Sequence, residues 1–405
     1  MSTSRKRILV FAEAVTLAHV ARPLAFAGAL ARDKYDVMIA VAPHAARHVV
    51  EAGVAHVPLS SIAPEAFLQA LAAGRPLYDA DTLSAYVEDD LRWIREFAPD
   101  LVVGDFRLSL SVSARVAEVP YATIASAYWS PFYDPPDWPV PALPLTRIVP
   151  LPIARRLFSA ARPMAFRLHC RPLNAVRKRY GLAPLAADLR RIYTDADHVL
   201  YSDLPALFPL KAAPASHRFL GPVLWQPSVP LPEWWDTLPD DRPIVYVTLG
   251  SSGERTLLAH VVDALAGLPI IVIAATVASA AGSALRDNVF VADYLPGISA
   301  ARRAALVVCN GGSLTGYQAL SAGVPVLGIA GNLDQFLNMQ GIELAGAGAL
   351  MRADRWSRQE LKRTAERLLS APEARGAARS LRAQCEQHEF TQRAAEFVVE
   401  RCSRH

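Results

Sequence analysis

The chain has 405 residues, of which 52% are hydrophobic and 20% are charged. That composition excludes a disordered chain and leaves room for two domains with separate cores. The formal net charge of +4 is too small to indicate a nucleic-acid partner. The four cysteines (Cys170, Cys309, Cys385 and Cys402) lack the paired spacing of a metal site or a disulfide framework, so neither is expected.

The first elements predict a parallel sheet. Residues 7–12 read as a buried strand, 23–31 as a helix and 35–41 as a second strand, with a loop at 13–19. This βαβ order is typical of an α/β, doubly wound fold, whose ligands bind beyond the carboxyl ends of the strands. Because Glu13 interrupts the first apolar run, a core strand is favoured over a signal peptide. No uncharged run reaches the roughly 18 residues of a membrane span, so we expect a cytoplasmic protein.

Two residues in this half have the chemistry of an acid–base pair. His19 falls in the loop after the first strand, and a neutral imidazole can take a proton from an alcohol near neutral pH. Asp105 ends a later strand, where its carboxylate could orient that imidazole. The alternatives are a structural or helix-capping histidine and an N-capping or surface aspartate. Asp100 precedes the same strand, so it is expected at the opposite edge.

An aromatic stretch and a basic stretch follow. Trp129, Phe132 and Tyr133 are close together, and residues 138–187 contain no acidic residue but many arginines interleaved with apolar side chains. This pattern fits the wall of a pocket for a bulky apolar or aromatic ligand, or a patch that touches an anionic membrane. It fits equally well a pair of ordinary amphipathic helices with solvated arginines.

The second half repeats a strand, a turn of small residues and a helix. A proline-rich segment at 222–232 reads as a linker, and residues 243–249 and 304–309 read as buried strands. Each of these strands runs into a turn whose free N–H groups, at the positive end of a helix dipole, favour phosphate. The turn residues are Gly250, Ser251 and Ser252 after the first strand, and Asn310, Gly311, Gly312 and Ser313 after the second.

The order of these motifs along the chain indicates a protein family. The chain resembles the GT-B glycosyltransferases of family 1, which include bacterial natural-product and macrolide enzymes and plant UDP-sugar transferases. Two positions depart from the family pattern: Asn310 replaces a phosphate-binding His, and Gln318 replaces a ribose-binding Glu. The residues that carry the resemblance are His19, Asp105, Gly250-Ser251, Tyr294, Pro296, Gly311-Gly312, Thr315, Ala319-Leu320, Gly323-Val324-Pro325 and Asp334-Gln335.

The resemblance implies two Rossmann-like domains that face a cleft and an inverting, metal-independent transfer of a sugar to a hydroxyl of a small apolar or aromatic acceptor. His19 would be the base and Asp105 its partner, while Trp129, Phe132 and Tyr133 would contact the acceptor. The domains would be 1–222 for the acceptor, 223–240 as linker, 241–389 for the donor and 390–405 as a helix that returns to the first domain. The donor-binding residues would be Gly250, Ser251, Ser252, Tyr294, Asn310, Gly311, Gly312, Ser313, Thr315, Gln318, Asp334 and Gln335.

The departures bear on the nucleotide. Gln318 offers a neutral oxygen where a Glu would accept from both ribose hydroxyls, which predicts a UDP-sugar, UDP-glucose first, with tolerance for the dTDP analogue. Alternatively, Gln318 packs inside the helix and touches no ribose, and Tyr294 is an ordinary strand residue rather than a platform for the base. No cofactor is expected beyond this co-substrate, and the protein would be a monomer or homodimer.

Three rival functions stay open at this point. They are a transferase with a lipid acceptor, a hydrolysing 2-epimerase of the same architecture, and a degenerate homologue that binds a nucleotide or small molecule without turnover. Such an epimerase needs more carboxylates near the sugar than the sequence supplies. Asn310 and Gln318 are the features that favour the degenerate homologue.

Overall fold

The computed structural model describes residues 5–250, 255–275 and 286–402, which form two compact units. Unit 1 comprises residues 1–136, 155–223 and 388–405, and unit 2 comprises residues 137–154 and 224–387. The sequence placed residues 137–154 in the first domain, whereas the structure joins them to unit 2. The Arg352 guanidinium donates to the carbonyls of Val140 and Pro141, which holds this segment on unit 2.

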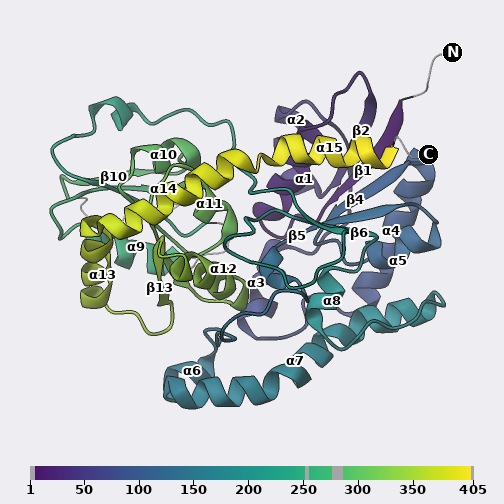
Figure 1. Ribbon diagram of the computed structural model, residues 1–405, viewed down its shortest axis with the longest axis horizontal. Helices are drawn as coiled ribbons and strands as arrows, with labels where there is room; N and C mark the ends of the chain where they lie inside the picture. Colours follow the sequence, from purple (N-terminus) through teal and green to yellow (C-terminus); the bar gives the residue numbers. More distant parts are fainter. Residues whose placement is uncertain (1–4, 251–254, 276–285, 403–405) are drawn as a thin grey trace. The chain divides into compact units, whose positions relative to one another are not determined.

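Unit 1 is built on a parallel sheet whose described strands run in the order β3-β2-β1-β4-β5-β6-β7 (Figure 1). The order reverses between β1 and β4, which pair in register from Ile8 with Leu101 to Ala12 with Asp105. The residues that follow β1 and β4 therefore leave the sheet at the same carboxyl edge. The strands are β1 Lys6–Ala12, β2 Tyr35–Val41, β3 Ala55–Pro58, β4 Leu101–Asp105, β5 Tyr121–Ala125, β6 His198–Tyr201 and β7 His217–Phe219.

Helices cover this sheet, as expected of strands that are buried on both faces. The helices of unit 1 are α1 Ala18–Gly28, α2 Ala46–Glu51, α3 Pro64–Ala72, α4 Ala80–Phe97, α5 Leu110–Val116, α7 Leu151–Arg179, α8 Leu189–Tyr193 and α15 Phe390–Cys402, with 3₁₀ turns η1 Pro43–Ala45 and η2 Ala127–Trp129. The first four residues of α7 are counted with unit 2. The doubly wound α/β fold predicted from the βαβ pattern is confirmed.

Unit 2 repeats the plan with a parallel sheet in the order β10-β9-β8-β11-β12-β13. The order reverses between β8 and β11, so the turns after these two strands share one edge. Its strands are β8 Ile244–Thr248, β9 Ile271–Ala275, β10 Val289–Ala292, β11 Leu306–Cys309, β12 Val326–Ala330 and β13 Gly348–Arg352. Its helices are α6 Pro144–Ile148, α9 Arg255–Leu265, α10 Gly297–Arg303, α11 Ser313–Ser321, α12 Leu333–Leu344, α13 Arg358–Ser370 and α14 Pro372–Gln387, with η3 Glu233–Thr237.

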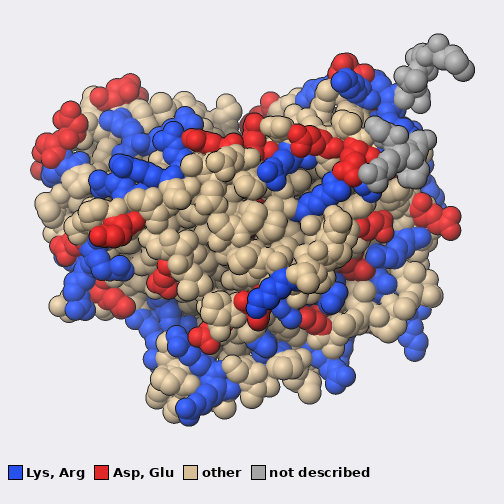
Figure 2. All heavy atoms as spheres, in the orientation of Figure 1, with Lys and Arg blue, Asp and Glu red and all other residues tan. Residues whose placement is uncertain are grey.

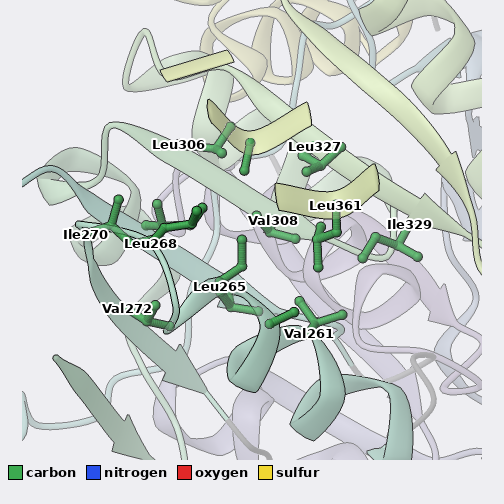
Figure 3. Packing of buried hydrophobic residues seen from close by; sticks show 14 of the residues in the cluster. Val261, Leu265, Leu268, Ile270, Val272, Leu306, Val308, Leu327, Ile329 and Leu361 are labelled. Carbon is green, nitrogen blue, oxygen red and sulfur yellow. The ribbon is translucent and has the colours of Figure 1, made fainter. Parts of the chain in front are cut away.

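One core cluster of unit 2 lies between the sheet and helices α9 and α13 (Figure 3). Val261 and Leu265 of α9 meet Val308 of β11 and Leu361 of α13, and all four are fully buried. Burying such a side chain is worth about 1.5–3 kcal/mol relative to leaving it exposed. This packing fixes the strands whose carboxyl ends carry the glycine turns.

The end of the chain belongs to unit 1. Helix α15 buries Phe390, Ala394, Phe397 and Val398, and its Glu400 pairs with Arg218 of β7. Where the chain enters this helix, it passes so close to Gly221 (φ +99°) that a Cβ there would lie 1.9 Å from the His388 carbonyl oxygen. Glycine is therefore the residue that this crossing requires.

The basic stretch forms short α6 and one long helix, α7, so the alternative of two helices is close to what the structure shows. Helix α7 runs for 29 residues and contains Pro163 and Pro172. A proline usually ends a helix because it removes one hydrogen bond. Pro163 and Ser159 are both exposed, so water can satisfy the carbonyl that lacks its partner. Among the described residues, no helix is long and apolar enough to cross a membrane.

His217 on β7 gives the fold a pH dependence. Burial, assisted by the charge of Arg191, lowers the pKa of His217 to about 4, and its Nδ1 lies 2.7 Å from Tyr201 Oη. Between about pH 6.5 and about pH 4 the unfolded chain therefore binds a proton that the folded one does not. This contribution to stability is present above pH 6.5 and is lost as the pH falls through that window.

We expect His217→Asn to lose less stability than the parent between pH 7 and about pH 4, because asparagine does not titrate there. Urea unfolding at several pH values measures this difference in slope. The exposed His56→Asn variant is the control and should follow the parent. Parallel curves for the parent and His217→Asn would contradict the prediction.

Candidate active site

The site in unit 1 is built where the strand order reverses, as the fold predicts. Asp105 is the last residue of β4, and His19 lies in the first turn of α1, not in the predicted loop. The sequence prediction started the helix at Pro23, where proline is often found at a first position. The structure instead starts it at Ala18 and keeps Pro23 inside, so the side chain of His19 is aimed by helical geometry.

His19 and Asp105 are in direct contact. His19 Nδ1 lies 2.7 Å from Asp105 Oδ1, and the two side chains are 16% and 1% exposed. Asp100, the competing carboxylate, bonds Lys6 and the Arg7 amide at the start of β1, which is the opposite edge as predicted. The structure therefore brings together the two residues that the sequence paired.

Arg22, which the sequence reasoning missed, completes this group. Its Nε lies 2.7 Å from Asp105 Oδ2, and its Nη2 lies 3.0 Å from Asp105 Oδ1 and 2.7 Å from His19 Nδ1. Nη1 donates to Ser126 Oγ at 3.1 Å and approaches Ser202 Oγ at 3.4 Å. His19 and Arg22 are three residues apart on one helix, a spacing that puts both side chains on one face and was available as a signal.

Two contacts meet at Nδ1 of His19. Asp105 Oδ1, 2.7 Å away, can only accept and so favours a proton on Nδ1, whereas Arg22 Nη2, also 2.7 Å away, can only donate and so favours a lone pair there. The first arrangement, in which Nδ1–H donates to Asp105, leaves Nε2 with a lone pair, and it is the one that a base at this position requires.

Aromatic side chains of unit 1 gather around His19. Phe106 stacks on the imidazole at 4.6 Å between ring centroids, with 21° between the planes. Phe67, Tyr78 and Tyr193 in turn contact Phe106 at 5.3–6.4 Å. None of these four was predicted to be a site residue, and Phe67, Tyr78 and Tyr193 come from segments far apart in the chain.

The three aromatic residues that the sequence named are separated by the structure. Trp129 meets Tyr193 edge to face at 5.2 Å, which attaches it to the cluster around His19. Phe132 packs against His217, and Tyr133, which is 5% exposed, packs against Phe208. Their ring contacts are therefore with a different part of unit 1.

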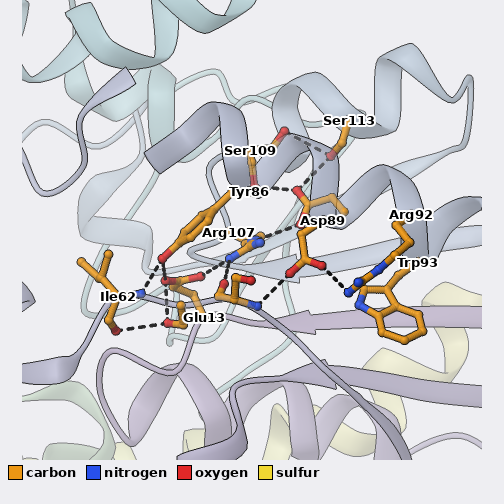
Figure 4. A network of polar contacts seen from close by, with 12 residues as sticks. Glu13, Ile62, Tyr86, Asp89, Arg92, Trp93, Arg107, Ser109 and Ser113 are labelled. Carbon is orange, nitrogen blue, oxygen red and sulfur yellow. Dashed lines mark hydrogen bonds and ion pairs between the residues drawn. The ribbon is translucent and has the colours of Figure 1, made fainter. Parts of the chain in front are cut away.

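A buried ionic network lies behind the cluster (Figure 4). Arg107 donates to Glu13 Oε2 at 2.8 Å and to Asp90 Oδ1 at 2.9 Å, and all three side chains are fully buried. Burial raises the pKa of Asp90 to about 6, although Arg107, Ser109 and Ser113 all stabilise its charge. Glu13 also accepts from Tyr86 and Ser61, so this network fixes the segment after β1 that leads to His19.

In unit 2 the glycine turns lie at the switch point between β8 and β11. Gly250 (φ +63°) is close to Asn310, which would lie 3.6 Å from an added Cβ. Asn310 is buried and its Oδ1 accepts from the Gly312 amide at 3.1 Å, while Gly311 has φ +83°. A Cβ at Gly311 would meet Met339 at 2.7 Å, so this turn requires glycine. Ser251 and Ser252 lie outside the described residues.

The other predicted donor residues follow these turns. Ser313 begins α11 behind the N-cap Gly312, Thr315 is half-buried in its first turn, and Tyr294 is half-buried in the loop after β10. Gln335 closes the capping box of α12, since its Oε1 accepts from the amide of the N-cap Asn332 at 3.3 Å, and it accepts also from the Gly331 amide at 2.8 Å. Half-buried Asp334 precedes it. Each lies at the carboxyl edge of the second sheet.

Gln318 is buried, and its Nε2 donates to the Trp225 carbonyl at 2.7 Å. Its Oε1 faces Gly297 so closely that a Cβ there would lie 2.3 Å away. The amide thus ties α11 to the segment before η3 and to α10. This geometry favours the packing alternative over a contact with ribose.

Titratable groups do not gather in the pattern of a metal site. Within residues 5–250, 255–275 and 286–402, no group of three or more His, Cys, Asp or Glu side chains is placed to hold an ion. Metal independence of the reaction nevertheless stays a prediction.

Two parallel-sheet units, a histidine–aspartate pair at one switch point and glycine turns at the other define the class of GT-B glycosyltransferases. Residues 255–400 match the family model described as the C-terminal domain of erythromycin biosynthesis protein CIII-like proteins. The spinosyn rhamnosyltransferase SpnG complexed with thymidine diphosphate aligns with a TM-score of 0.70 and 19% identity, over 98% of this chain and all of that one.

Two curated relatives from Mycobacterium tuberculosis are much closer in sequence. The PGL/p-HBAD biosynthesis rhamnosyltransferase (strain CDC 1551 / Oshkosh) is 51% identical over 94% of this chain and 84% of the relative. The PGL/p-HBAD biosynthesis glycosyltransferase (strain ATCC 25177 / H37Ra) is 48% identical over 93% and 88%. The chain belongs to this family of GT-B glycosyltransferases, and the predicted family is confirmed.

The position of Arg22 predicts the effect of removing it. Arg22→Gln removes the guanidinium that pairs with buried Asp105 and leaves its contact with His19, so we expect a loss of roughly 3–5 kcal/mol in unfolding free energy. Arg22→Lys should lose less stability, because lysine keeps the positive charge. It should still lose some, because lysine lacks the planar fork that spans Asp105 and Ser126. Chemical denaturation measures both, with exposed Arg363→Gln as control. Equal stability of Arg22→Gln and the control would show that the guanidinium does not support Asp105.

Proposed function

We propose that the protein transfers a 6-deoxyhexose, rhamnose in the first place, from a dTDP donor to an aromatic hydroxyl, with inversion at the anomeric carbon. The observation that carries this function is the His19–Asp105 pair, held at 2.7 Å and stacked against Phe106 within a group of aromatic rings. A base beside flat apolar surfaces suits an alcohol or phenol borne on a ring.

In the tautomer whose Nδ1–H donates to Asp105, His19 can accept the acceptor's proton at Nε2 while the acceptor oxygen bonds to the anomeric carbon. The bond from that carbon to the diphosphate oxygen breaks in the same displacement, which inverts the centre. Asp105 stabilises the imidazolium that forms, and Arg22 holds the Asp105 carboxylate in place.

Aromatic residues support the choice of acceptor. Ring pairs prefer offset-stacked and edge-to-face contacts at about 4.5–7 Å, and the cluster around His19 already uses both. An acceptor ring can extend this arrangement with its hydroxyl toward the imidazole. A long apolar substituent on that ring is compatible with the same contacts, so a lipid-linked phenol is included in the acceptor class.

Unit 2 supplies the groups for the leaving diphosphate. Backbone amides at Gly250 and in the turn from Asn310 to Ser313, together with the N-terminus of α11, can stabilise its developing charge. Asn310 can add only a neutral hydrogen bond, weaker than one from a protonated histidine. Asp334 remains our candidate to hold sugar hydroxyls, with the amide nitrogen of Gln335.

Two observations support the choice of donor. Gln318 lacks the carboxylate that would accept from both ribose hydroxyls, and its amide is bonded to Trp225. This position therefore gives no preference for a nucleotide that has a 2′-hydroxyl. One relative at 51% identity is named a rhamnosyltransferase, and SpnG was solved with thymidine diphosphate. UDP-glucose, which the sequence favoured, is the competing donor.

The base assignment predicts that His19→Ala loses roughly 10²–10⁴-fold in turnover while donor affinity stays nearly unchanged. Turnover is measured with an aromatic alcohol as acceptor, and donor affinity by calorimetry. His56→Ala, at an exposed position on β3, serves as the matched control and should keep full activity. A His19→Ala enzyme as fast as the parent at neutral pH would remove the base from the mechanism.

The nucleotide assignment is tested with Gln318→Glu. A glutamate cannot donate to the Trp225 carbonyl, so we expect a loss of roughly 1–3 kcal/mol in stability. The ratio of turnover with dTDP- and UDP-sugars should stay in favour of dTDP in both proteins. If the substitution shifts that ratio strongly toward UDP, Gln318 reads the ribose as the sequence suggested, and our donor assignment fails.

A further inference from the structure

Helix α7 exposes an apolar stripe. Leu157, Met164 and Leu168 are 51%, 56% and 41% exposed, and their spacings of seven and four residues place them on one face of the helix. The opposite face is anchored in unit 1, where Phe166, Cys170, Leu173 and Val176 are buried. The stripe is therefore not a frayed end but the outer side of a helix whose inner side is fixed.

Arginines run beside the stripe. Arg156, Arg167 and Arg171 are exposed, and each is a neighbour of a stripe residue in sequence or one helical turn away. Residues 138–187 contain no acidic side chain to offset them. Figure 2, in the orientation of Figure 1, shows basic and uncharged side chains interspersed over α7.

The combination of exposed apolar and basic side chains on α7 favours one kind of binding partner over the others. A second copy of the chain would bring the same arginines against one another, which costs energy at short range. A nucleic acid would use the arginines but leave the leucines and methionine in water. An anionic bilayer uses both, because apolar side chains enter the boundary between headgroups and acyl chains while arginines reach lipid phosphates.

We propose that α7 is a membrane-docking helix that lies in the plane of an anionic lipid surface. Leu157, Met164 and Leu168 insert, and Arg156, Arg167 and Arg171 bind the phosphates. Such docking would keep the transferase at a surface where an apolar acceptor partitions. It does not depend on the identity of the donor or on the His19 mechanism.

Flotation of the full-length protein with phosphatidylcholine vesicles, with and without phosphatidylglycerol, tests this. We expect binding that requires phosphatidylglycerol and weakens as salt is raised, because surface potentials are screened. Absence of binding to the anionic vesicles at low salt would overturn the proposal. Equal binding to both vesicle types would also overturn it, since the arginines would then contribute nothing.

Two triple variants separate the contributions. Changing Arg156, Arg167 and Arg171 to Gln should weaken binding roughly 10–100-fold, given about a tenfold effect or slightly less for each basic residue near the surface. Changing Leu157, Met164 and Leu168 to Ser should weaken it by roughly tenfold or more. Matched controls elsewhere, Leu344→Ser at a 63% exposed site and Arg363, Arg367 and Arg379 changed to Gln, should bind like the parent.

Two further measurements test whether α7 has a different role. All variants should keep the parent's thermal unfolding and its turnover of a water-soluble aromatic acceptor, because the changed side chains are exposed. A loss of soluble turnover without a loss of vesicle binding would instead place α7 in acceptor recognition. A parent dimer that the Ser variant converts to a monomer would identify the stripe as a contact between copies. Either result would overturn membrane docking.

Discussion

Unit 1 depends on one buried carboxylate. Asp105 is 1% exposed, and an ionised group so deeply buried must be paired and hydrogen-bonded. Its partners come from α1, through His19 and Arg22, and the Arg22 fork continues to Ser126 after β5 and Ser202 after β6. A single charge therefore ties together the carboxyl ends of β4, β5 and β6 and the first turns of α1. Its contact with His19 Nδ1 favours the tautomer that a base requires.

Much of this arrangement could be predicted from the sequence, because it follows from strand order. A parallel sheet places the residues after β1 and β4 at one edge, so His19 and Asp105 could be paired before any geometry was known. The family resemblance assigned Gly250 and the Asn310–Ser313 turn to one donor, and the structure places both turns at the same edge of the second sheet. The start of α1 was predicted wrongly because Pro23 was taken as a first-turn signal, whereas the structure retains proline within the helix.

What could not be predicted are contacts whose two sides are far apart in the chain. Phe67, Tyr78 and Tyr193 come from three separate segments and all contact Phe106. No local sequence pattern predicts these contacts. Gln318 was compared with a ribose-binding Glu by motif position, yet its amide bonds Trp225, 93 positions away along the chain. Motif position identifies which side chain is available, but burial and partners decide what it binds.

Phe106 shows how the catalytic pair and the ionic network constrain each other. It has φ +56°, a left-handed conformation that costs a non-glycine residue roughly 1–3 kcal/mol. The residues on either side are both buried ions, Asp105 bound to Arg22 and His19, and Arg107 bound to Glu13 and Asp90. Because neither ion can leave its partners without stranding a buried charge, the strain at Phe106 is retained. The turn that results presents the Phe106 ring to the imidazole. The buried ions Asp105 and Arg107 thus determine the surface against which an acceptor ring would pack, although neither is proposed to touch the acceptor.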